Sequence, residues 1–544
     1  MSPEVRLSRR RLLAGVSGLA VLSVGGLPLA GCSRATTSKE GGSSGPVTLP
    51  RYQPPTGVRP ELPGTATGVP DGYLSYPAEP FEASSGTPGS GTAVTALFSS
   101  FAVSPAPAPR NTYLAELNTR VGADLQLQVT PAPDYPAKLA TTVTGELPDV
   151  LEILPTQAQL PQLLRATCAD LTDHLSGDAV NAYPNLAAFT NDMWRTVIFD
   201  NRIFGLPVPR PVQSGAAFIR TDLFEQRGLD PKPMSWEEFV QLCRDLTDAR
   251  KGQYALSQPP IAYLTGALGG PNEWVDQDGS LVRLQETEQF RQALMWCAEL
   301  NQQGLIHPDA FAVNATTLGK QRLVGGQVGI HPDGFSAWGS LARFLPAEQQ
   351  NSIGALPVVG FAGATPTFAV GAGSTNFTAI KKADDGRVVE LLKIMNYLSA
   401  PFGSREFLFR KYGNAGTQHT VVDGNPTLTK QGMDEITPVT EGFDYHLADG
   451  VKVAYEGSLR DITRAKYEFA KAAEPGYVRS SVIGLYSDTY SRTNSTFART
   501  MTDLQNGVIT GRATIGALQE ALASWNAGDG KKIKEEFSAA RAAQ

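Results

Sequence analysis

At residues 199–210 the sequence is Phe-Asp-Asn-Arg-Ile-Phe-Gly-Leu-Pro-Val-Pro-Arg, and this stretch decides how we interpret the rest of the chain. Asp200 and Asn201 are residue types that favour a tight turn, and the apolar residues after them predict a short strand that stops at Pro207. We therefore expect a hairpin that feeds an exposed loop.

An ordered series of short phrases follows this hairpin. The chain continues with an apolar strand and Arg-Thr-Asp-Leu-Phe at 216–224, Gly-Leu at 228–229, and Pro-Met-Ser-Trp-Glu-Glu-Phe at 233–239. This order resembles the extracellular solute-binding proteins, family 1, of carbohydrate ABC transporters. The resemblance implies that the chain crosses here from one lobe to the other, beside a ligand cleft.

The length and the apolar pattern favour a two-lobed protein. A chain of 544 residues is too long for one ordinary core. Short apolar runs at 92–98, 125–129 and 148–154 alternate with helical segments, which predicts an α/β lobe with a largely parallel sheet and ligands at the carboxyl ends of its strands. With the resemblance, we expect a periplasmic-binding-protein-like fold with a hinge, residues 91–215 and 365–450 forming lobe 1, and residues 216–364 and 451–544 forming lobe 2.

The N-terminus is typical of an export signal. Arg9, Arg10 and Arg11 precede a weakly apolar segment that ends near Ala30, so residues 1–31 predict a signal peptide of the twin-arginine type, with an ordinary Sec signal as the alternative. Leu-Ala-Gly-Cys at 29–32 resembles a bacterial lipobox. It implies cleavage before Cys32, lipid attachment to that thiol, and tethering to the outer face of the cell membrane.

The segment after the lipobox has an unusual composition. Of the 58 residues from 33 to 90, 34 are Gly, Pro, Ser or Thr. Such a segment buries little apolar surface, so residues 32–90 predict a lipidated cysteine followed by a flexible tether. Tyr73, Tyr76 and Phe81 suggest that its end packs on the folded part.

Later phrases extend the resemblance over most of residues 91–540. The segment from Tyr412 to Thr420 is similar to a phrase of the subfamily associated with aldouronate and related oligosaccharides, and Asp423 and Gly424 predict the turn of a hairpin after it. The resemblance implies a monomer that captures a carbohydrate, an oligosaccharide, and delivers it to the permease subunits of an ABC transporter. A ligand-presenting sensor lipoprotein and an extracellular polysaccharide-processing enzyme are the alternatives.

The sequence was also searched for catalytic and metal-binding patterns. The five histidines form no H-x₃-H or HExxH pattern, and no GxSxG phrase occurs, so we expect no catalytic residues, no metal and no cofactor. The net charge of −6 and the lack of a basic run after the leader exclude nucleic acid as a favoured partner. Cys243 and Cys297 lie on apolar helix faces and predict core thiols, while a disulfide to Cys168 stays open.

Aromatic side chains in loops are the first candidates for sugar contacts, because a pyranose offers flat C–H faces to an aromatic ring. Trp274 and Trp338 lie in predicted loops and either contact the ligand or plug the domain surface. Phe335, near Trp338, and Tyr486, where the family often turns back toward the cleft, complete this set.

Polar candidates were chosen for contacts to sugar hydroxyls or carboxylates. Arg210, just past the crossing strand, suits a uronic-acid carboxylate, with a surface or hinge salt bridge as the alternative. Asp333, Asn272 and Gln157 are further polar candidates in predicted loops.

Overall fold

The computed structural model describes residues 47–312 and 314–542. Its first sheet has five strands in the order β2-β1-β3-β14-β6. Strand β1 pairs in parallel with β2 and β3, whereas β14 is antiparallel to β3 and β6. The strands are β1 (Ala93–Ser100), β2 (Asp124–Pro131), β3 (Val150–Ile153), β6 (Leu206–Pro209) and β14 (Ser374–Ile380).

Helices cover the first sheet and close its core. Helix α1 begins after Asn111, whose side chain accepts a hydrogen bond from the Leu114 amide at 2.9 Å, and ends at Gly122 in a left-handed conformation. The neighbouring helices of this lobe are α1 (Thr112–Val121), α2 (Tyr135–Thr142), α3 (Leu160–Thr167), α4 (Thr172–Leu175), α5 (Pro184–Ala187), α6 (Asn191–Arg195), α13 (Asp385–Leu398), α14 (Arg405–Tyr412) and α15 (Lys430–Gly442). The first core therefore joins residues from 94–206 with residues from 377–448.

The second sheet has four strands in the order β12-β7-β11-β8. Its strands are β7 (Gly215–Arg220), β8 (Tyr254–Leu256), β11 (Val328–Gly334) and β12 (Ile353–Ala355). The helices of this lobe are α7 (Thr221–Arg227), α8 (Trp236–Leu246), α9 (Ile261–Ala267), α10 (Glu288–Gln302), α11 (Ala315–Val324) and α12 (Ala337–Arg343). Cys243 of α8 and Cys297 of α10 are fully buried in its core. Cys168 is also a free, buried cysteine, so within the described residues it forms no disulfide.

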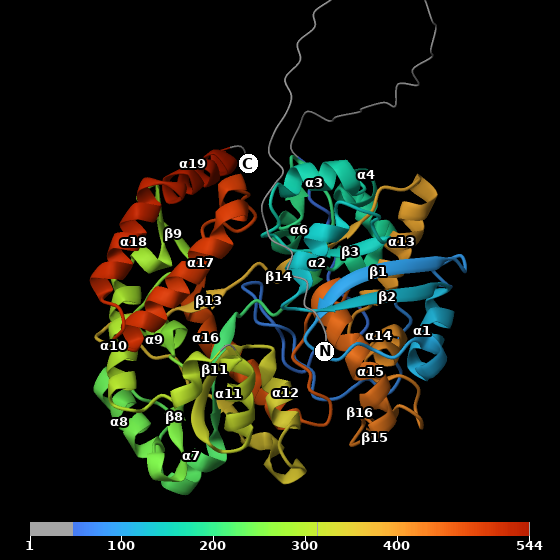
Figure 1. Cartoon of the computed structure of the whole chain (residues 1–544). Coiled ribbons are helices and arrows are strands. Elements are labelled where there is room, and N and C mark those ends of the chain that lie inside the picture. Colours follow the sequence, from blue (N-terminus) through green and yellow to red (C-terminus); the bar gives the residue numbers. More distant parts are fainter. Residues whose placement is uncertain (1–46, 313, 543–544) are drawn as a thin grey trace, which may run out of the picture. The chain divides into compact units, whose positions relative to one another are not determined.

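The C-terminal helices complete the second lobe. Helix α16 (Arg460–Ala473) packs on α12, while α17 (Asp488–Ile509), α18 (Ile515–Ala527) and α19 (Asp529–Ala542) pack together beside α10. Figure 1 shows these red helices next to the yellow-green α10. A small sheet of β9 (Trp274–Gln277) and β10 (Ser280–Arg283) lies against them, with Trp274 packed on Phe537.

The opening hairpin lies on the segment that leads from the first sheet to the second. Strands β4 (Ile198–Phe199) and β5 (Arg202–Ile203) form the hairpin, and Asp200 and Asn201 have the positive φ values, 48° and 61°, that its turn requires. The chain then leaves the first sheet at β6 and enters the second at β7. Strand β13 (Phe368–Val370), on the way back to β14, pairs with β17 (Tyr477–Arg479). The hairpin predicted after Tyr412 is also present, as β15 (His419–Val422) and β16 (Asn425–Leu428).

Residues 47–90, which we call the N-terminal strap, differ from the flexible tether expected for residues 32–90. Val69 is 2% exposed and belongs to the core around Phe218 of the second lobe. The Tyr76 hydroxyl donates to the Ser404 carbonyl at 2.7 Å, and the Tyr467 hydroxyl donates to the Pro63 carbonyl at 2.7 Å. A few apolar anchors and backbone hydrogen bonds hold the strap, and average composition does not reveal them.

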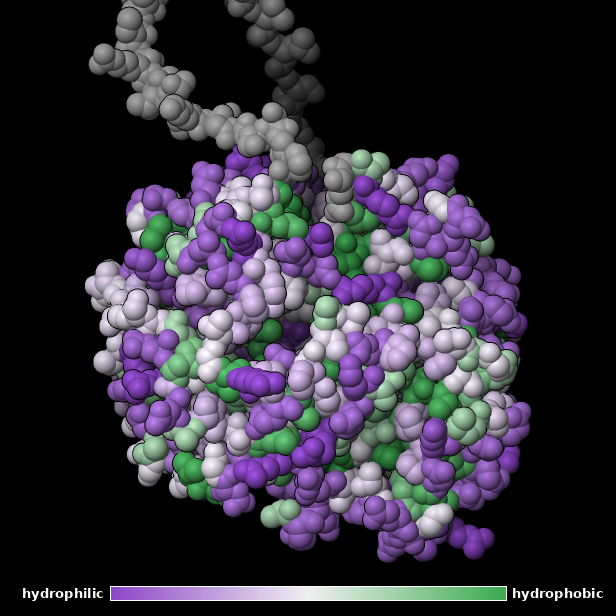
Figure 2. All heavy atoms as spheres, turned by 180° about the vertical axis from the view of Figure 1, so that it is seen from behind, coloured by the Kyte–Doolittle hydropathy of each residue, from purple (hydrophilic) through white to green (hydrophobic). Residues whose placement is uncertain are grey.

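The predicted signal peptide and Cys32 lie outside the described residues. Within residues 47–312 and 314–542, no helix has the length and apolar character needed to cross a bilayer. The face seen in Figure 2 is a mixture of hydrophilic and hydrophobic residues, with a hollow near its centre.

Candidate ligand pocket

A pocket of about 380 Å³ lies where the two lobes meet. The first lobe contributes Pro155, the 195–199 segment before the hairpin, and the start of β14. The second lobe contributes Asn272 and Glu273, the loop before α17, and Phe537 of α19, and the crossing segments contribute Ser214 and residues 370–372. The volume is within the range of about 300–1,000 Å³ that is usual for small-molecule sites.

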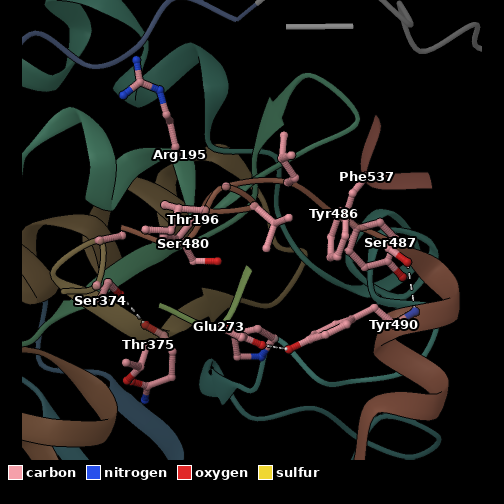
Figure 3. Close-up of a pocket in the computed structure, with 18 of the residues that line it drawn as sticks. Arg195, Thr196, Glu273, Ser374, Thr375, Ser480, Tyr486, Ser487, Tyr490 and Phe537 are labelled. Atoms are coloured by element: carbon pink, nitrogen blue, oxygen red, sulfur yellow. Dashed lines mark hydrogen bonds between the residues drawn. The ribbon is translucent and has the colours of Figure 1, made fainter. Parts of the chain in front are cut away.

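Hydroxyl and amide groups make up most of the polar lining. The lining side chains of this kind are Thr196, Ser214, Asn272, Ser374, Thr375, Asn376, Ser480, Ser487 and Ser491. The Ser480 hydroxyl is buried and has no hydrogen-bond partner within the described residues. It lies among the labelled side chains of Figure 3. A buried hydroxyl without a partner is costly, so this oxygen is suited to a ligand group.

The amides in the pocket are fixed by the crossing segments. The Asn272 side-chain amide donates to the carbonyl of Val370 at 2.9 Å and to that of Val478 at 3.3 Å, which ties the pocket to β13 and β17. The Asn376 amide donates to Glu152 at 2.8 Å and to the Tyr445 carbonyl at 3.2 Å. Both N–H groups of each amide are therefore used within the protein, which fixes the side chain and leaves the amide oxygen as its group for a ligand.

Aromatic rings form the apolar part of the lining. Tyr486 meets the ring of Phe199 at 5.9 Å and 82°, and its hydroxyl lies 3.2 Å from Ser491 Oγ. Burial raises the pKa of Tyr486 above its ordinary value, so the hydroxyl stays protonated at neutral pH. The Tyr490 hydroxyl donates to Glu273 at 2.6 Å, as Figure 3 shows.

Comparison with known proteins was made at the level of sequence and of structure. No protein-family model matches the chain. Lipoprotein LipO of Bacillus subtilis (strain 168) is 19% identical over 454 residues, which are 79% of this chain and 89% of LipO. The polygalacturonan/rhamnogalacturonan-binding protein YtcQ of the same organism is 20% identical over 379 residues, which are 67% of this chain and 75% of YtcQ.

Alignments to solved structures cover a larger share of this chain than the sequence alignments do. The alginate-binding protein AlgQ2 aligns with a TM-score of 0.63 at 14% identity, over 84% of this chain and 99% of its own. An HMO binding ABC-transporter associated solute binding protein from Bifidobacterium longum infantis aligns with a TM-score of 0.61 at 14% identity, with the same coverage. The N-glycan transport solute binding protein NgtS of Streptococcus pneumoniae aligns with a TM-score of 0.58 at 17% identity, over 82% of this chain and 98% of its own.

The chain has the two-lobed fold of an extracellular solute-binding protein. The resemblance and the fold class inferred from the order of the sequence phrases are therefore confirmed. In this solute-binding fold the pocket lies between the lobes, beside the crossing segments that the opening hairpin introduces.

The structure brings two of the sequence-predicted residues into the pocket. Asn272 and Tyr486 both line it, from opposite ends of the second lobe's sequence. Gln157 is half-buried in the turn after β3, two residues beyond the lining residue Pro155. These three positions stay our candidates for ligand contact.

The other aromatic candidates lie outside the pocket lining. Trp274 is 0% exposed and packs on Phe537 and Trp525 at 5.7 and 6.1 Å. Trp338 is 1% exposed and donates its ring N–H to the Ile353 carbonyl at 3.0 Å, and Phe335, 2% exposed, packs against it. Of the two alternatives for the tryptophans, this packing favours a structural role, because such rings offer no face to a sugar.

The charged candidates are also engaged elsewhere. Arg210 donates to the Tyr445 carbonyl at 2.9 Å and lies over the Tyr445 ring at 4.6 Å. Asp333 pairs with Lys320 at 3.1 Å, and its carboxylate also lies near His331. Burial raises the pKa of Asp333, but the hydrogen bond to His331 and the charge of Lys320 outweigh it, so the pKa is below its usual value.

Several lining residues were missed by sequence reasoning. Ser480, Ser374 and Thr375 are small hydroxyl residues in loops, and nothing in their local sequence separates them from ordinary loop residues. Tyr490 was not among the candidates, although it follows Tyr486 closely and lies in the first turn of α17. Phe199 lies just before the predicted turn in the opening stretch and was not among the candidates.

A serine, a histidine and an aspartate come together in the second lobe. Ser257 Oγ is 2.7 Å from His331 Nδ1, and His331 Nε2 is 3.5 Å from Asp333 Oδ2. Ser257, which directly follows β8, and His331, which is part of β11, are both 0% exposed. A nucleophile has to meet its substrate, so this buried set is a structural hydrogen-bond network.

Within the described residues, no group of three side chains suited to metal binding occurs.

Proposed function

We propose that this protein is an exported lipoprotein that captures a carbohydrate between its lobes and delivers it to the permease of an ABC transporter. The observation that carries the proposal is the pocket between the lobes, in which aromatic rings lie beside hydroxyl and amide groups. Sugars are recognised by this combination, because rings cover their C–H faces while hydroxyls and amides bond their hydroxyl groups.

The relatives support the ligand class. YtcQ is named for binding polygalacturonan and rhamnogalacturonan, AlgQ2 for alginate, and NgtS for N-glycan transport. A lipoprotein among the relatives supports lipid attachment at Cys32, and with it export through the predicted signal at residues 1–31 and anchoring to the outer face of the membrane. The monomeric state is a further part of the proposal. The twin-arginine route remains part of this proposal.

We further propose that the ligand is released unchanged. Closure of the two lobes on the ligand shifts a population between open and closed states, and the permease then receives the ligand from the closed state. Two features support binding without turnover: the similar solved structures are solute-binding proteins, and the Ser257–His331 pair lies in the core.

Calorimetric titration of the full-length chain, purified in detergent, with a panel of oligosaccharides tests the proposal. We expect saturable binding of at least one saccharide. Loss of a ring contact is worth about 0.5–1.5 kcal/mol, so Tyr486→Ala is expected to weaken binding about 3- to 10-fold. Two variants serve as controls for the binding affinity. Tyr486→Phe keeps the ring, and Tyr52→Ala changes an aromatic residue that does not line the pocket. Equal affinities for the wild type and Tyr486→Ala would remove this pocket as the ligand site.

A further inference from the structure

The charges of the pocket lining bear on whether its ligand is an acidic or an uncharged carbohydrate. A uronic-acid saccharide carries one carboxylate per acidic unit, and burying such a charge is costly unless a cation pairs with it. Proteins that recognise carboxylates do so best with an arginine fork or a lysine that no protein carboxylate already occupies. We therefore examined each charged side chain in and around the pocket.

Only two charged side chains belong to the described pocket lining, Arg195 and Glu273. The Arg195 guanidinium is 2.8 Å from Asp192, and Asp192 also pairs with Arg479. In Figure 3 the Arg195 guanidinium points away from the other labelled side chains. The two arginines at this rim therefore share a protein carboxylate outside the pocket.

Glu273 brings a negative charge to the opposite side of the pocket. Its carboxylate accepts the Tyr490 hydroxyl at 2.6 Å and is 3.9 Å from Arg283. Its side chain is still 43% exposed, so this charge is not enclosed by protein. A ligand carboxylate placed beside it would be repelled.

The nearby buried arginines, Arg283 and Arg210, do not line the pocket. Arg283 has a 5% exposed side chain, donates to Asn494 at 2.7 Å and lies 4.3 Å from the Phe497 ring centre. Arg210, the residue expected to meet a uronic acid, does not line the pocket. The carboxylates of Glu152, Asp444 and Asp449 already lie in its electrostatic surroundings.

The remaining polar lining consists of neutral groups. Ser480 offers a buried hydroxyl without a partner, and Asn272 and Asn376 hold their amides in fixed positions. The Ser480 hydroxyl can donate and accept, and the amide oxygens can accept, so these groups match sugar hydroxyls. We infer that the pocket selects an uncharged saccharide and discriminates against uronic-acid saccharides, unlike the polygalacturonan- and alginate-binding relatives. This inference rests on the proposed function and names its ligand class.

The test is a calorimetric comparison of matched saccharide pairs on the full-length chain in detergent at pH 7. Each pair has the same length and linkage, and one member is neutral while the other carries uronic acids, as with galacto- and galacturono-oligosaccharides or manno- and mannurono-oligosaccharides. We expect the neutral member of the recognised pair to bind at least about tenfold more tightly, a difference of about 1.4 kcal/mol.

A single substitution tests whether the charge of Glu273 lowers the affinity for uronic-acid saccharides. Glu273→Gln removes the negative charge, so we expect the uronic-to-neutral affinity ratio to rise several-fold. Glu348→Gln is the matched control, because Glu348 is exposed and lies outside the pocket, and it should leave the ratio unchanged. Thermal unfolding of both variants verifies that they are folded.

Each outcome has a defined meaning. Equal or tighter binding of the uronic member, or a ratio that Glu273→Gln leaves unchanged, overturns the inference while the carbohydrate-binding function stands. Binding of neither member in any pair overturns the proposed function as well as the inference.

Discussion

The Tyr490 hydroxyl lies 2.6 Å from a carboxylate oxygen of Glu273, so helix α17 is hydrogen-bonded to the residue that precedes β9 at the edge of the pocket. Glu273 has a positive φ of 50°, an uncommon conformation for a residue with a side chain. The hydrogen bond helps to hold this conformation and fixes the position of the one carboxylate among the described lining residues.

Tyr490→Phe removes this hydrogen bond and keeps the ring. We expect the free energy of unfolding to fall by about 1 kcal/mol, since Glu273 is partly exposed and regains water. Urea unfolding measures the change, and Tyr52→Phe, at a 47% exposed position outside the pocket lining, is the control. A loss as small as that of the control would show that the bond does not stabilise the lobe.

A buried ion-pair cluster in the first lobe is expected to be essential for stability. Arg410 is 0% exposed and pairs with Asp449, whose side chain is 3% exposed and also lies 3.1 Å from Lys411. Asp449→Asn leaves buried cations without their partner, so we expect a loss of about 3–5 kcal/mol of unfolding free energy. Asp434→Asn breaks the exposed Lys430–Asp434 pair and should cost less than about 1 kcal/mol. Similar losses for the two variants would contradict the account of the cluster.

The same cluster predicts a pH dependence. Burial raises the pKa of Asp449, but the charges of Arg410, Lys411 and Lys452 outweigh it and hold the pKa far below the usual value. A lowered pKa contributes stability above the unfolded-state pKa of about 3.9, and this contribution is lost as the pH falls toward the folded-state value. The difference in unfolding free energy between the wild type and Asp449→Asn should therefore be constant between pH 5 and 7 and shrink below about pH 4. A difference that does not depend on pH would rule out this linkage.

The N-terminal strap should stabilise the folded body. Tyr76 is 6% exposed, donates to the Ser404 carbonyl at 2.7 Å and meets Phe402 edge-on at 5.0 Å. Tyr76→Ala leaves a cavity and an unpaired carbonyl, so we expect a loss of about 3–5 kcal/mol in urea unfolding. Tyr52→Ala, at a 47% exposed position of the same strap, should change stability by less than about 0.5 kcal/mol. Wild-type stability in Tyr76→Ala would mean that the strap adds nothing to the fold.

The fold was predictable because the turn residues, the apolar runs and their order along the chain all indicate the same architecture. The turn residues Asp200 and Asn201 require a hairpin, and the apolar runs around them alternate with capped helices, so both the crossing and the α/β class follow from the sequence. The strap was not predictable in the same way. Its anchors are single residues such as Val69 and Tyr76 within a segment rich in Gly, Pro, Ser and Thr, and an average over the segment conceals them.

The pocket was only partly predictable, because its residues come from distant segments. Asn272 and Tyr486 were found because they lie in loops beside motifs, whereas Ser480 has no distinguishing sequence signal. Trp338 was expected in a loop, but α12 begins at Ala337, and the indole is packed between Phe218 and Phe335. Sequence shows that an aromatic residue is present, but only the packing shows which of its faces is free.

We claim centrally that the pocket binds a carbohydrate without altering it. The most direct test is thermal unfolding of the full-length chain with each saccharide. Chromatography of that saccharide afterwards shows whether it was altered. A ligand present at a hundredfold excess over its dissociation constant adds about 2.7 kcal/mol of stability. The account predicts a higher melting temperature with at least one saccharide, recovered at its original length. Shortened products, or an unchanged melting temperature across neutral and acidic saccharides, would contradict it.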